Sequence, residues 1–293
     1  MQNSSTCFVE EGTAKVLMEI IYVTVLILGP IGIVLMIYLM NKPNSLSITT
    51  TAIINLLVIH SIFLLTVPFR LVYYFKGRWL FEYTFCKIVS AMIHIHLYTS
   101  FFFYVEILVI RHFSYFTERD NVSFNRRLHA VSASVIAWAI VLAFILPAFI
   151  FYDNSDQYNG TECFTFQNNL NESTRNLNYV IVVFVLFIVC VLLAVQCFIL
   201  VKVAKKLQVP LCTHQEFWVE LKSLAFILVM IVFFFPSLLF RTFYLQHLHC
   251  SLENEIFLSL SALSCLDRIV FFLNYYIGGC LCYTTIMCTL WNI

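Results

Sequence analysis

Hydrophobic residues in this chain gather in long blocks that are separated by short polar segments. Seven blocks can be recognised, at 20–40, 46–69, 88–105, 128–152, 176–201, 223–240 and 256–293. The first six contain no Lys, Arg, Asp or Glu, and only Asp267 and Arg268 interrupt the last. Because about 18 consecutive apolar residues suffice to cross a bilayer as a helix, the pattern predicts seven membrane-spanning helices.

The composition favours a membrane protein over a soluble helix bundle. Of the 293 residues, 61% are hydrophobic and 11% are charged, whereas soluble domains carry about 25% charged residues. We therefore predict an all-α membrane protein, a bundle of seven transmembrane helices over residues 16–279. Residues 1–15 would form an extracellular tail and residues 280–293 a short carboxyl-terminal tail.

The distribution of basic residues predicts the orientation. With the amino terminus outside, the inner segments are 41–47, 112–127 and 202–222, and more lysines and arginines lie in or beside them than in the outer segments. Three N-x-S/T sequons then lie outside as glycosylation sites, while Asn121 lies inside; the outer ones are Asn3, Asn159 and Asn171. We expect a multi-pass protein of the plasma membrane.

The cysteines predict disulfides on the outer side. Four of the 11 fall in the expected outer segments, namely Cys7, Cys86, Cys163 and Cys250. An even number in an oxidising compartment indicates two bridges, and three pairings are open. Cys265 and the other cysteines within spans are expected to pack as small apolar residues. Three more near the carboxyl terminus fit S-palmitoylation and unmodified thiols equally well: Cys280, Cys282 and Cys288.

Sequence motifs of enzymes and metal centres are missing. The chain has no C-x-x-C, H-E-x-x-H or G-x-S-x-G motif, and its 7 glycines include no phosphate-binding loop. We therefore expect no enzymatic activity, no cofactor, no metal site and no nucleic-acid partner. His94 and His96 are two residues apart and should point to different sides of a helix.

Three basic residues are expected near the outer ends of spans. Ionisable side chains within spans mark functional sites or the bundle interior. Arg70, His94 and Arg241 can line one outward-open cavity, which would favour an anionic ligand because arginine binds carboxylate or phosphate through paired hydrogen bonds. In the alternative arrangement, Arg70 and Arg241 pair with outer acids such as Glu253 or Asp156.

Arg111 lies at the end of the third block. A helix from Cys86 to Arg111 would be about 37 Å long, so Arg111 should emerge at the cytoplasmic face. Its guanidinium can there reach water as an ordinary interface arginine, or it can reach a protein partner.

Several residues recur in the order and spacing of one receptor family. They are Asn55 in "NLLVIHSIFLLTVPFRLVYY", Trp79 and Cys86 in "RWLFEYTFCKI", Arg111, Trp138, Pro236 and Arg241 in "FFFPSLLFR", and Asp267 in "LSCLDRIVFF". Together they resemble the rhodopsin-like (class A) G-protein-coupled receptors, and Arg241 resembles the F-x-P-x-H-x-x-R pattern of the purinoceptor-like branch, with Leu238 at the histidine position.

The resemblance implies a lipid-embedded receptor that activates a heterotrimeric G protein in response to an extracellular ligand. It implies the disulfides Cys86–Cys163 and, in the purinoceptor-like branch, Cys7–Cys250. The expected ligand contacts are Arg70, His94, Tyr98, Arg241 and Phe257. The expected G-protein contacts are Arg111, His112, Arg126, Lys202, Lys205 and Lys206. The expected switch between receptor states involves His60, Phe234, Pro236, Asp267, Arg268 and Phe271.

The chain also departs from the family pattern. His60 replaces a sodium-binding aspartate, and we expect no sodium dependence because imidazole nitrogen suits sodium poorly. Ile110 replaces the acid before Arg111, and Glu106 lies on another helical face, so we expect ligand-independent signalling. Arg268 replaces a proline and is expected to pair with Asp267 or to lie near His60.

Two other functions fit the same hydrophobic pattern. A transporter or channel of seven helices would need a polar path across the membrane, but apart from His60 the charges within spans lie near the ends. A receptor-like protein that no longer signals would explain the altered switch motifs.

Overall fold

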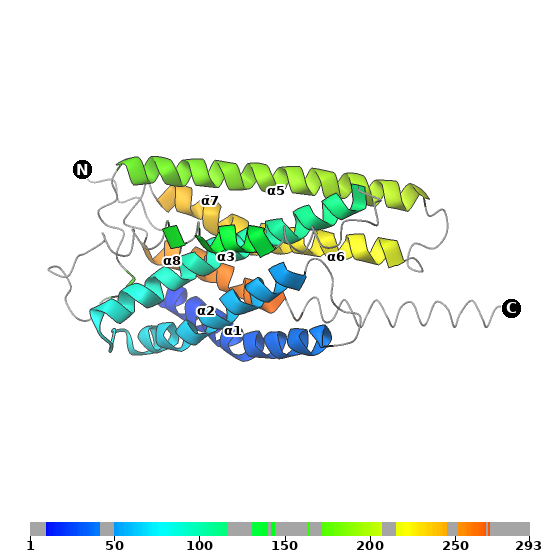
Figure 1. The fold of residues 1–293 in the computed structure, drawn as a ribbon. Helices are drawn as coiled ribbons and strands as arrows, with labels where there is room; N and C mark the ends of the chain where they lie inside the picture. Colours follow the sequence, from blue (N-terminus) through cyan, green and yellow to red (C-terminus); the bar gives the residue numbers. More distant parts are fainter. Residues whose placement is uncertain are drawn as a thin grey trace.

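The chain folds into a helical bundle. The computed structural model describes residues 10–41, 50–116, 131–139, 142–143, 163–164, 172–206, 215–244, 251–267 and 269. Every regular element within these ranges is a helix (Figure 1). The labelled elements are α1 (Glu11–Met40), α2 (Thr50–Lys76), α3 (Tyr83–Phe116), α5 (Glu172–Lys206), α6 (Gln215–Val229), η3 (Met230–Phe234), α7 (Phe235–Tyr244), α8 (Ser251–Ala262) and η4 (Leu263–Leu266). Residues 131–139 are helical as well. The predicted all-α class is therefore confirmed.

Five helical stretches of the described chain are long and apolar enough to cross a membrane. They are Gly12–Met40, Thr50–Lys76, Tyr83–Phe113, Tyr179–Lys206 and Ser223–Tyr244. These stretches coincide with the first, second, third, fifth and sixth hydrophobic blocks. The fourth and seventh blocks are described in part and are helical there. A helix suits each block because it satisfies all backbone hydrogen bonds without water.

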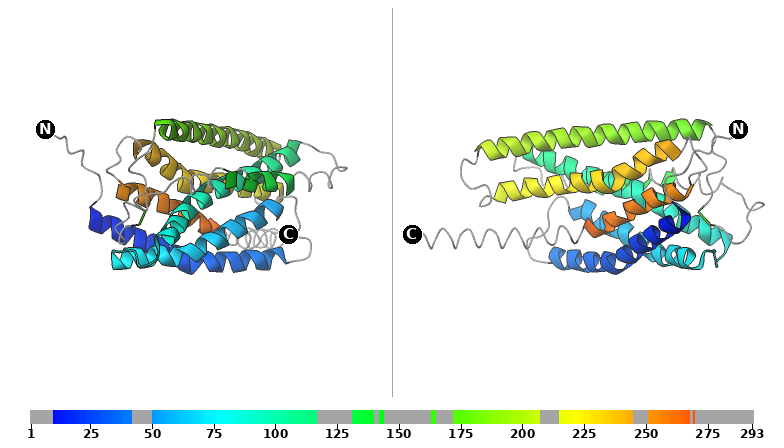
Figure 2. Two further views of the ribbon diagram at one scale, coloured as in Figure 1. Left: turned by 60° about the vertical axis from the view of Figure 1, so that its left-hand side comes forward. Right: turned by 180° about the vertical axis from the view of Figure 1, so that it is seen from behind.

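Helix α3 forms the centre of the bundle. In the most apolar stretch of α3, 61% of the residues are buried. In the corresponding stretches of α1 and α5, only 28% are buried. Figures 1 and 2 show α3 crossing the bundle obliquely, with α5 along one side and α1 along the opposite side. The outer helices expose large apolar side chains such as Val34, Phe184 and Phe187, as expected for surfaces that face lipid.

Helices α1 and α2 pack closely at a glycine. A Cβ atom on Gly29 would lie 2.8 Å from Cδ2 of Leu64 on α2. Such a distance is shorter than van der Waals contact, so any larger residue would displace the Leu64 side chain. Gly29 therefore permits the close approach of these two helices.

The sixth block is helical but not uniform. A five-residue π-helical segment, η3, separates α6 from α7, and Pro236 follows in the first turn of α7. Proline lacks a backbone N–H, and a π segment is an identified source of helix bending. The segment places Phe234 in the buried core.

Candidate functional site

The two ends of α3 carry different chemistry and are named here the disulfide end and the Arg111 end. At the disulfide end, Cys86 is bonded to Cys163, with their Cα atoms 5.9 Å apart. Trp79 and Phe164 pack around this bridge. The Cys86–Cys163 pair is the one that the family resemblance implies.

Arg70 lies in the core at the disulfide end. Its side chain has no exposed surface, and its Nη1 lies 3.3 Å from Oε2 of Glu255 on α8. Nη1 also donates to the Tyr22 hydroxyl at 3.3 Å, and Nη2 donates to the Val89 carbonyl at 2.9 Å. The guanidinium lies over the Phe164 ring at 4.4 Å. Arg70 thus joins α1, α2, α3 and α8.

This environment corresponds to the second arrangement considered for Arg70, in which it pairs with an acid. The partner is Glu255, two residues after the proposed Glu253. With its charge balanced and its surface fully covered, Arg70 does not present a cation to a ligand in this structure.

His94 and Arg241 meet between α3 and α7. Arg241 Nη1 lies 3.3 Å from His94 Nδ1. Both side chains are half-buried, and so is Tyr98, one turn further along α3. Phe257 on α8 is also half-buried and stacks on Phe240, with ring centroids 4.2 Å apart. The structure therefore brings Arg241 together with His94, and places the aromatic pair on the neighbouring α7 and α8.

A polar contact in the middle of the bundle joins α3 to the seventh block. The Tyr104 hydroxyl donates to Oδ2 of Asp267 at 2.5 Å. The Tyr104 ring packs edge-on against Phe234, with centroids 5.7 Å apart. Two predicted switch residues, Phe234 and Asp267, therefore share one contact residue that the sequence did not suggest.

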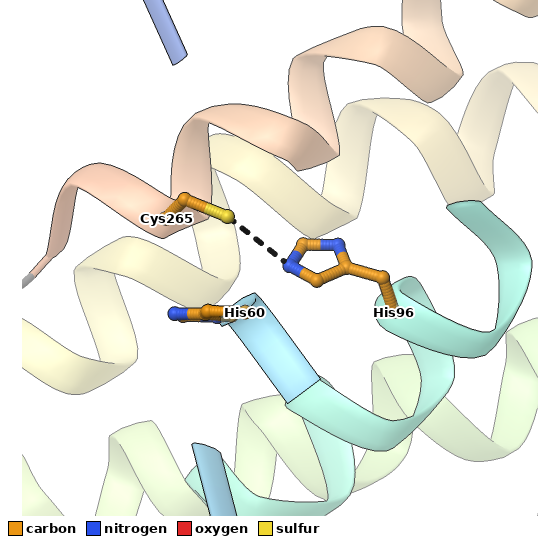
Figure 3. Close-up of side chains that lie close together, drawn as sticks. All are labelled: His60, His96 and Cys265. Atoms are coloured by element: carbon orange, nitrogen blue, oxygen red, sulfur yellow. Dashed lines mark hydrogen bonds between the residues drawn. The ribbon is translucent and has the colours of Figure 1, made fainter. Parts of the chain in front are cut away.

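Three further side chains meet nearby in the core. Cys265 Sγ lies 3.5 Å from His96 Nε2, and the His60 ring centroid lies 5.0 Å from that of His96 (Figure 3). His94 and His96 point to different sides of α3, as predicted. No metal site was predicted for the chain, yet the potential ligand atoms of His60, His96 and Cys265 lie within 4.8 Å of one another.

Arg111 contacts the sixth block at its own end of the bundle. Its Nη1 donates to Ser223 Oγ at 3.2 Å, and its guanidinium lies 5.1 Å from the Phe226 ring centroid. Among the described residues Arg111 forms no ion pair, and Glu106 instead accepts a hydrogen bond from Ser134 at 3.4 Å. Arg111 therefore touches α6 through neutral groups, and the Glu220 carboxylate on the same helix adds an electrostatic attraction without a direct ion pair.

The neighbouring His112 begins a second connection at this end. His112 Nε2 lies 2.7 Å from Gln196 Oε1 on α5. Gln196 Nε2 then donates to Oε2 of Glu220 on α6 at 2.9 Å. All three side chains are buried, so this network joins α3, α5 and α6.

Of the predicted G-protein contacts at the Arg111 end, the three lysines are exposed, whereas Arg111 is half-buried and His112 is buried. Lys202, Lys205 and Lys206 project from the last turns of α5, and Lys202 lies 5.8 Å from the Tyr115 ring centroid. Other predicted site residues lie outside the described residues, namely Cys7, Cys250, Arg126, Arg268, Phe271, Asn3, Asn159 and Asn171.

The sequence did not single out several residues that complete these contacts. Glu255 could have been found as an acid at the start of the seventh block, and Gln196 as one polar residue inside an apolar run. No sequence signal marks Tyr104 or Ser223 as partners of specific residues, because their contacts depend on how helices distant in sequence are packed. Trp138 and Asn55, both recognised from the sequence, are joined by a 3.0 Å hydrogen bond.

Comparison with known proteins assigns the fold to a family. The family profile "7 transmembrane receptor (rhodopsin family)" matches residues 32–274. The chain is 43% identical over 282 residues to human "Probable G-protein coupled receptor 141", covering 93% of this chain and 91% of that protein. It is 25% identical to human "Cysteinyl leukotriene receptor 2", over 84% of this chain and 71% of that protein.

Chicken "Lysophosphatidic acid receptor 6" is 29% identical over 58% of this chain and 56% of that protein. The family architecture has seven transmembrane helices, which agrees with the seven hydrophobic blocks. Its members are receptors and not enzymes. This chain is therefore a multi-pass protein of the plasma membrane and belongs to the rhodopsin-like family of G-protein-coupled receptors.

Proposed function

We propose that the protein transmits the binding of an extracellular ligand at the disulfide end to a heterotrimeric G protein at the Arg111 end. The single observation that carries this proposal is the set of contacts joining α3, α5 and α6 around Arg111 and His112. In one state these contacts can hold α3, α5 and α6 together at the Arg111 end. In another state the contacts can break, so that the helices move apart. Ligand and G protein would then each favour the same state of a two-state element.

The proposed orientation places the disulfide end and the amino terminus outside the cell. The Cys86–Cys163 bond supports this orientation, because structural disulfides persist in oxidising compartments. The exposed lysines at the end of α5 also support it, since basic residues are enriched on the cytoplasmic side. The exposed apolar sides of α1 and α5 would contact membrane lipid.

The proposed ligand is anionic. Half-buried Arg241 and His94 offer nitrogen atoms 3.3 Å apart near the disulfide end, and Phe240 and Phe257 offer aromatic surface nearby on α7 and α8. Arginine is the preferred protein partner of carboxylate and phosphate groups. One similar protein is named as a receptor for an acid, lysophosphatidic acid. That name is consistent with an anionic ligand for this chain.

At the other end, activation would move α6 away from α3 and α5. Arg111 would leave Ser223 and Phe226 and would donate hydrogen bonds to acceptors on the G protein. The three exposed lysines would provide long-range attraction to an acidic surface of the G protein; they are Lys202, Lys205 and Lys206. Because Ser223 is a neutral acceptor, the bond that must be broken is weaker than a charged pair. High ligand-independent signalling therefore remains part of the proposal.

The decisive experiment is guanine-nucleotide exchange with the purified full chain and a panel of purified heterotrimeric G proteins. We expect the wild-type chain to accelerate exchange on at least one of them, and Arg111→Ala to reduce that acceleration at least tenfold. Arg78→Ala is the matched control, because Arg78 is exposed in the turn after α2 at the disulfide end. It should leave exchange unchanged.

Two outcomes would contradict the proposal. Equal exchange by the wild type and Arg111→Ala would show that Arg111 is not part of the coupling surface. Absence of exchange on every G protein, together with substrate flux in liposomes containing the chain, would instead favour a transporter or channel.

A further inference from the structure

Three potential metal ligands converge inside the bundle from three separate segments. His60 comes from α2, His96 from α3 and Cys265 from η4. Figure 3 shows the His96 ring pointing at the Cys265 sulfur, with His60 beside this pair. The three residues are 0 to 1% exposed, and one potential ligand atom from each lies within 4.8 Å of the others.

The separations are close to those of a zinc site. Zinc bonds to histidine nitrogen at about 2.0–2.1 Å and to cysteine sulfur at about 2.3 Å, so two such ligands of a tetrahedral ion lie about 3.6 Å apart. Cys265 Sγ and His96 Nε2 are already 3.5 Å apart. The potential ligand atoms lie within 4.8 Å of one another, so His60 would have to move by about 1 Å to reach the spacing of a zinc site.

The surroundings restrict the ring of His96. Phe63 on α2 stacks on it with ring centroids 4.3 Å apart, which fixes the plane in which the imidazole nitrogens lie. His96 Nδ1 and Ser100 Oγ are both buried and have no hydrogen-bond partner among the described residues. Because Ser100 lies one turn from His96 on the same face of α3, polar groups extend beyond the three ligands.

The donor atoms indicate which ion would bind. Two imidazole nitrogens and one sulfur suit zinc and softer ions, whereas sodium, magnesium and calcium prefer oxygen ligands. From this geometry and donor set we propose that His60, His96 and Cys265 bind one zinc ion. A water molecule would take the fourth position.

Binding would change the charge inside the bundle. Cysteine binds zinc as the thiolate, so Cys265 would release its proton to solvent while both histidines bind as neutral imidazoles. The two positive charges of zinc and the one negative charge of the thiolate would sum to a net charge of +1 on the complex. Bound zinc would also tie α2, α3 and η4 to one another in the middle of the membrane-spanning part.

The test uses the full chain purified in detergent, stripped with a chelator, reloaded with zinc and freed of unbound metal. Zinc per protein is measured by mass spectrometry. We expect about one more zinc per molecule in the wild type than in Cys265→Ala, and the same loss in His60→Gln. Cys197→Ala is the matched control, because Cys197 is an exposed cysteine on α5, and it should keep the zinc.

Cobalt(II) provides a readout that reports the sulfur ligand directly. A thiolate-to-cobalt charge-transfer band should appear in the wild type and in Cys197→Ala, and should be missing in Cys265→Ala. Equal zinc content and equal cobalt spectra in wild type and Cys265→Ala would overturn the proposal. If Cys265→Ala does not fold, retention of zinc by His60→Gln, or no retained zinc in the wild type, would overturn it as well. None of these readouts depends on a ligand or a G protein.

Discussion

Two arginines at opposite ends of the bundle show two ways to place a permanent charge in an apolar protein. Arg70 is completely covered, and an ion pair with Glu255 balances its charge at 3.3 Å. Arg111 is half-buried and contacts the Ser223 hydroxyl and the Phe226 ring, with no ion pair in the described part of the chain. Arg70 is held by a direct ion pair, whereas Arg111 directly contacts only neutral groups and the Glu220 carboxylate attracts it from a greater distance.

The difference follows from the cost of separating each pair. Leaving one member of a buried ion pair without its partner costs about 3–5 kcal/mol, whereas a hydrogen bond between a charged and a neutral group contributes about 1.5–3 kcal/mol. The environment of Arg70 is therefore suited to fixing four helices in one arrangement. That of Arg111 is suited to a contact that is made and broken, which is what the proposed coupling requires.

The largest expected effect comes from breaking the Arg70 pair. Glu255→Gln should lower the free energy of unfolding by about 3–5 kcal/mol, because the guanidinium stays buried without an opposite charge. Thermal unfolding of the purified chain would measure it, with Glu82→Gln, an exposed acid at the same end, as the control. The double change Arg70→Leu with Glu255→Leu should recover most of the loss. Equal unfolding temperatures for Glu255→Gln and Glu82→Gln would contradict this role for the pair.

Removal of Gln196 should have the next largest effect. Gln196→Leu would leave His112 and Glu220 buried without their present partner, at a cost of about 1–3 kcal/mol for each group. We expect lower thermal stability and a several-fold rise in ligand-independent nucleotide exchange. Cys197→Ala, at the next position on α5 but exposed, should change stability by less than about 0.5 kcal/mol. Unchanged exchange by Gln196→Leu would show that this network does not restrain the Arg111 end.

A smaller effect is expected at the partner of Arg111. Ser223→Ala removes one hydrogen bond to the charged Arg111, worth about 1.5–3 kcal/mol, which corresponds to a roughly tenfold or larger change in an equilibrium. Basal nucleotide exchange should rise by that order while ligand-stimulated exchange stays intact. A decrease in basal exchange would mean that this contact supports the coupling state rather than opposing it.

The smallest effect is expected from the aromatic contact. Phe226→Leu keeps an apolar side chain but removes the ring beneath the Arg111 guanidinium, a contact worth about 0.5–1 kcal/mol. A double-mutant cycle with Ser223→Ala would measure whether the two contacts act together. If they restrain the same arginine, the combined effect on basal exchange should differ from the sum of the single effects.

Much of the candidate site could be predicted from the sequence because its residues stand out against an apolar background. Arg70, Arg111 and Asp267 are conspicuous as charges at the ends or interruptions of hydrophobic blocks, and Cys86 with Cys163 fits the family spacing. The partners of these residues could not be assigned. Arg70 and Glu255 are 185 positions apart, and no local pattern records which helices meet at such a distance.

The sequence by itself determined that the chain crosses a membrane as several helices, because only a helix satisfies the backbone of so long an apolar block in lipid. It also determined the family, through the order of a few distinctive residues. Tertiary structure decided which charge is balanced, which directly contacts only neutral groups, and that His60, His96 and Cys265 meet. These outcomes depend on the rotation and crossing of helices, which side-chain packing between distant segments sets and which hydrophobic periodicity alone does not specify.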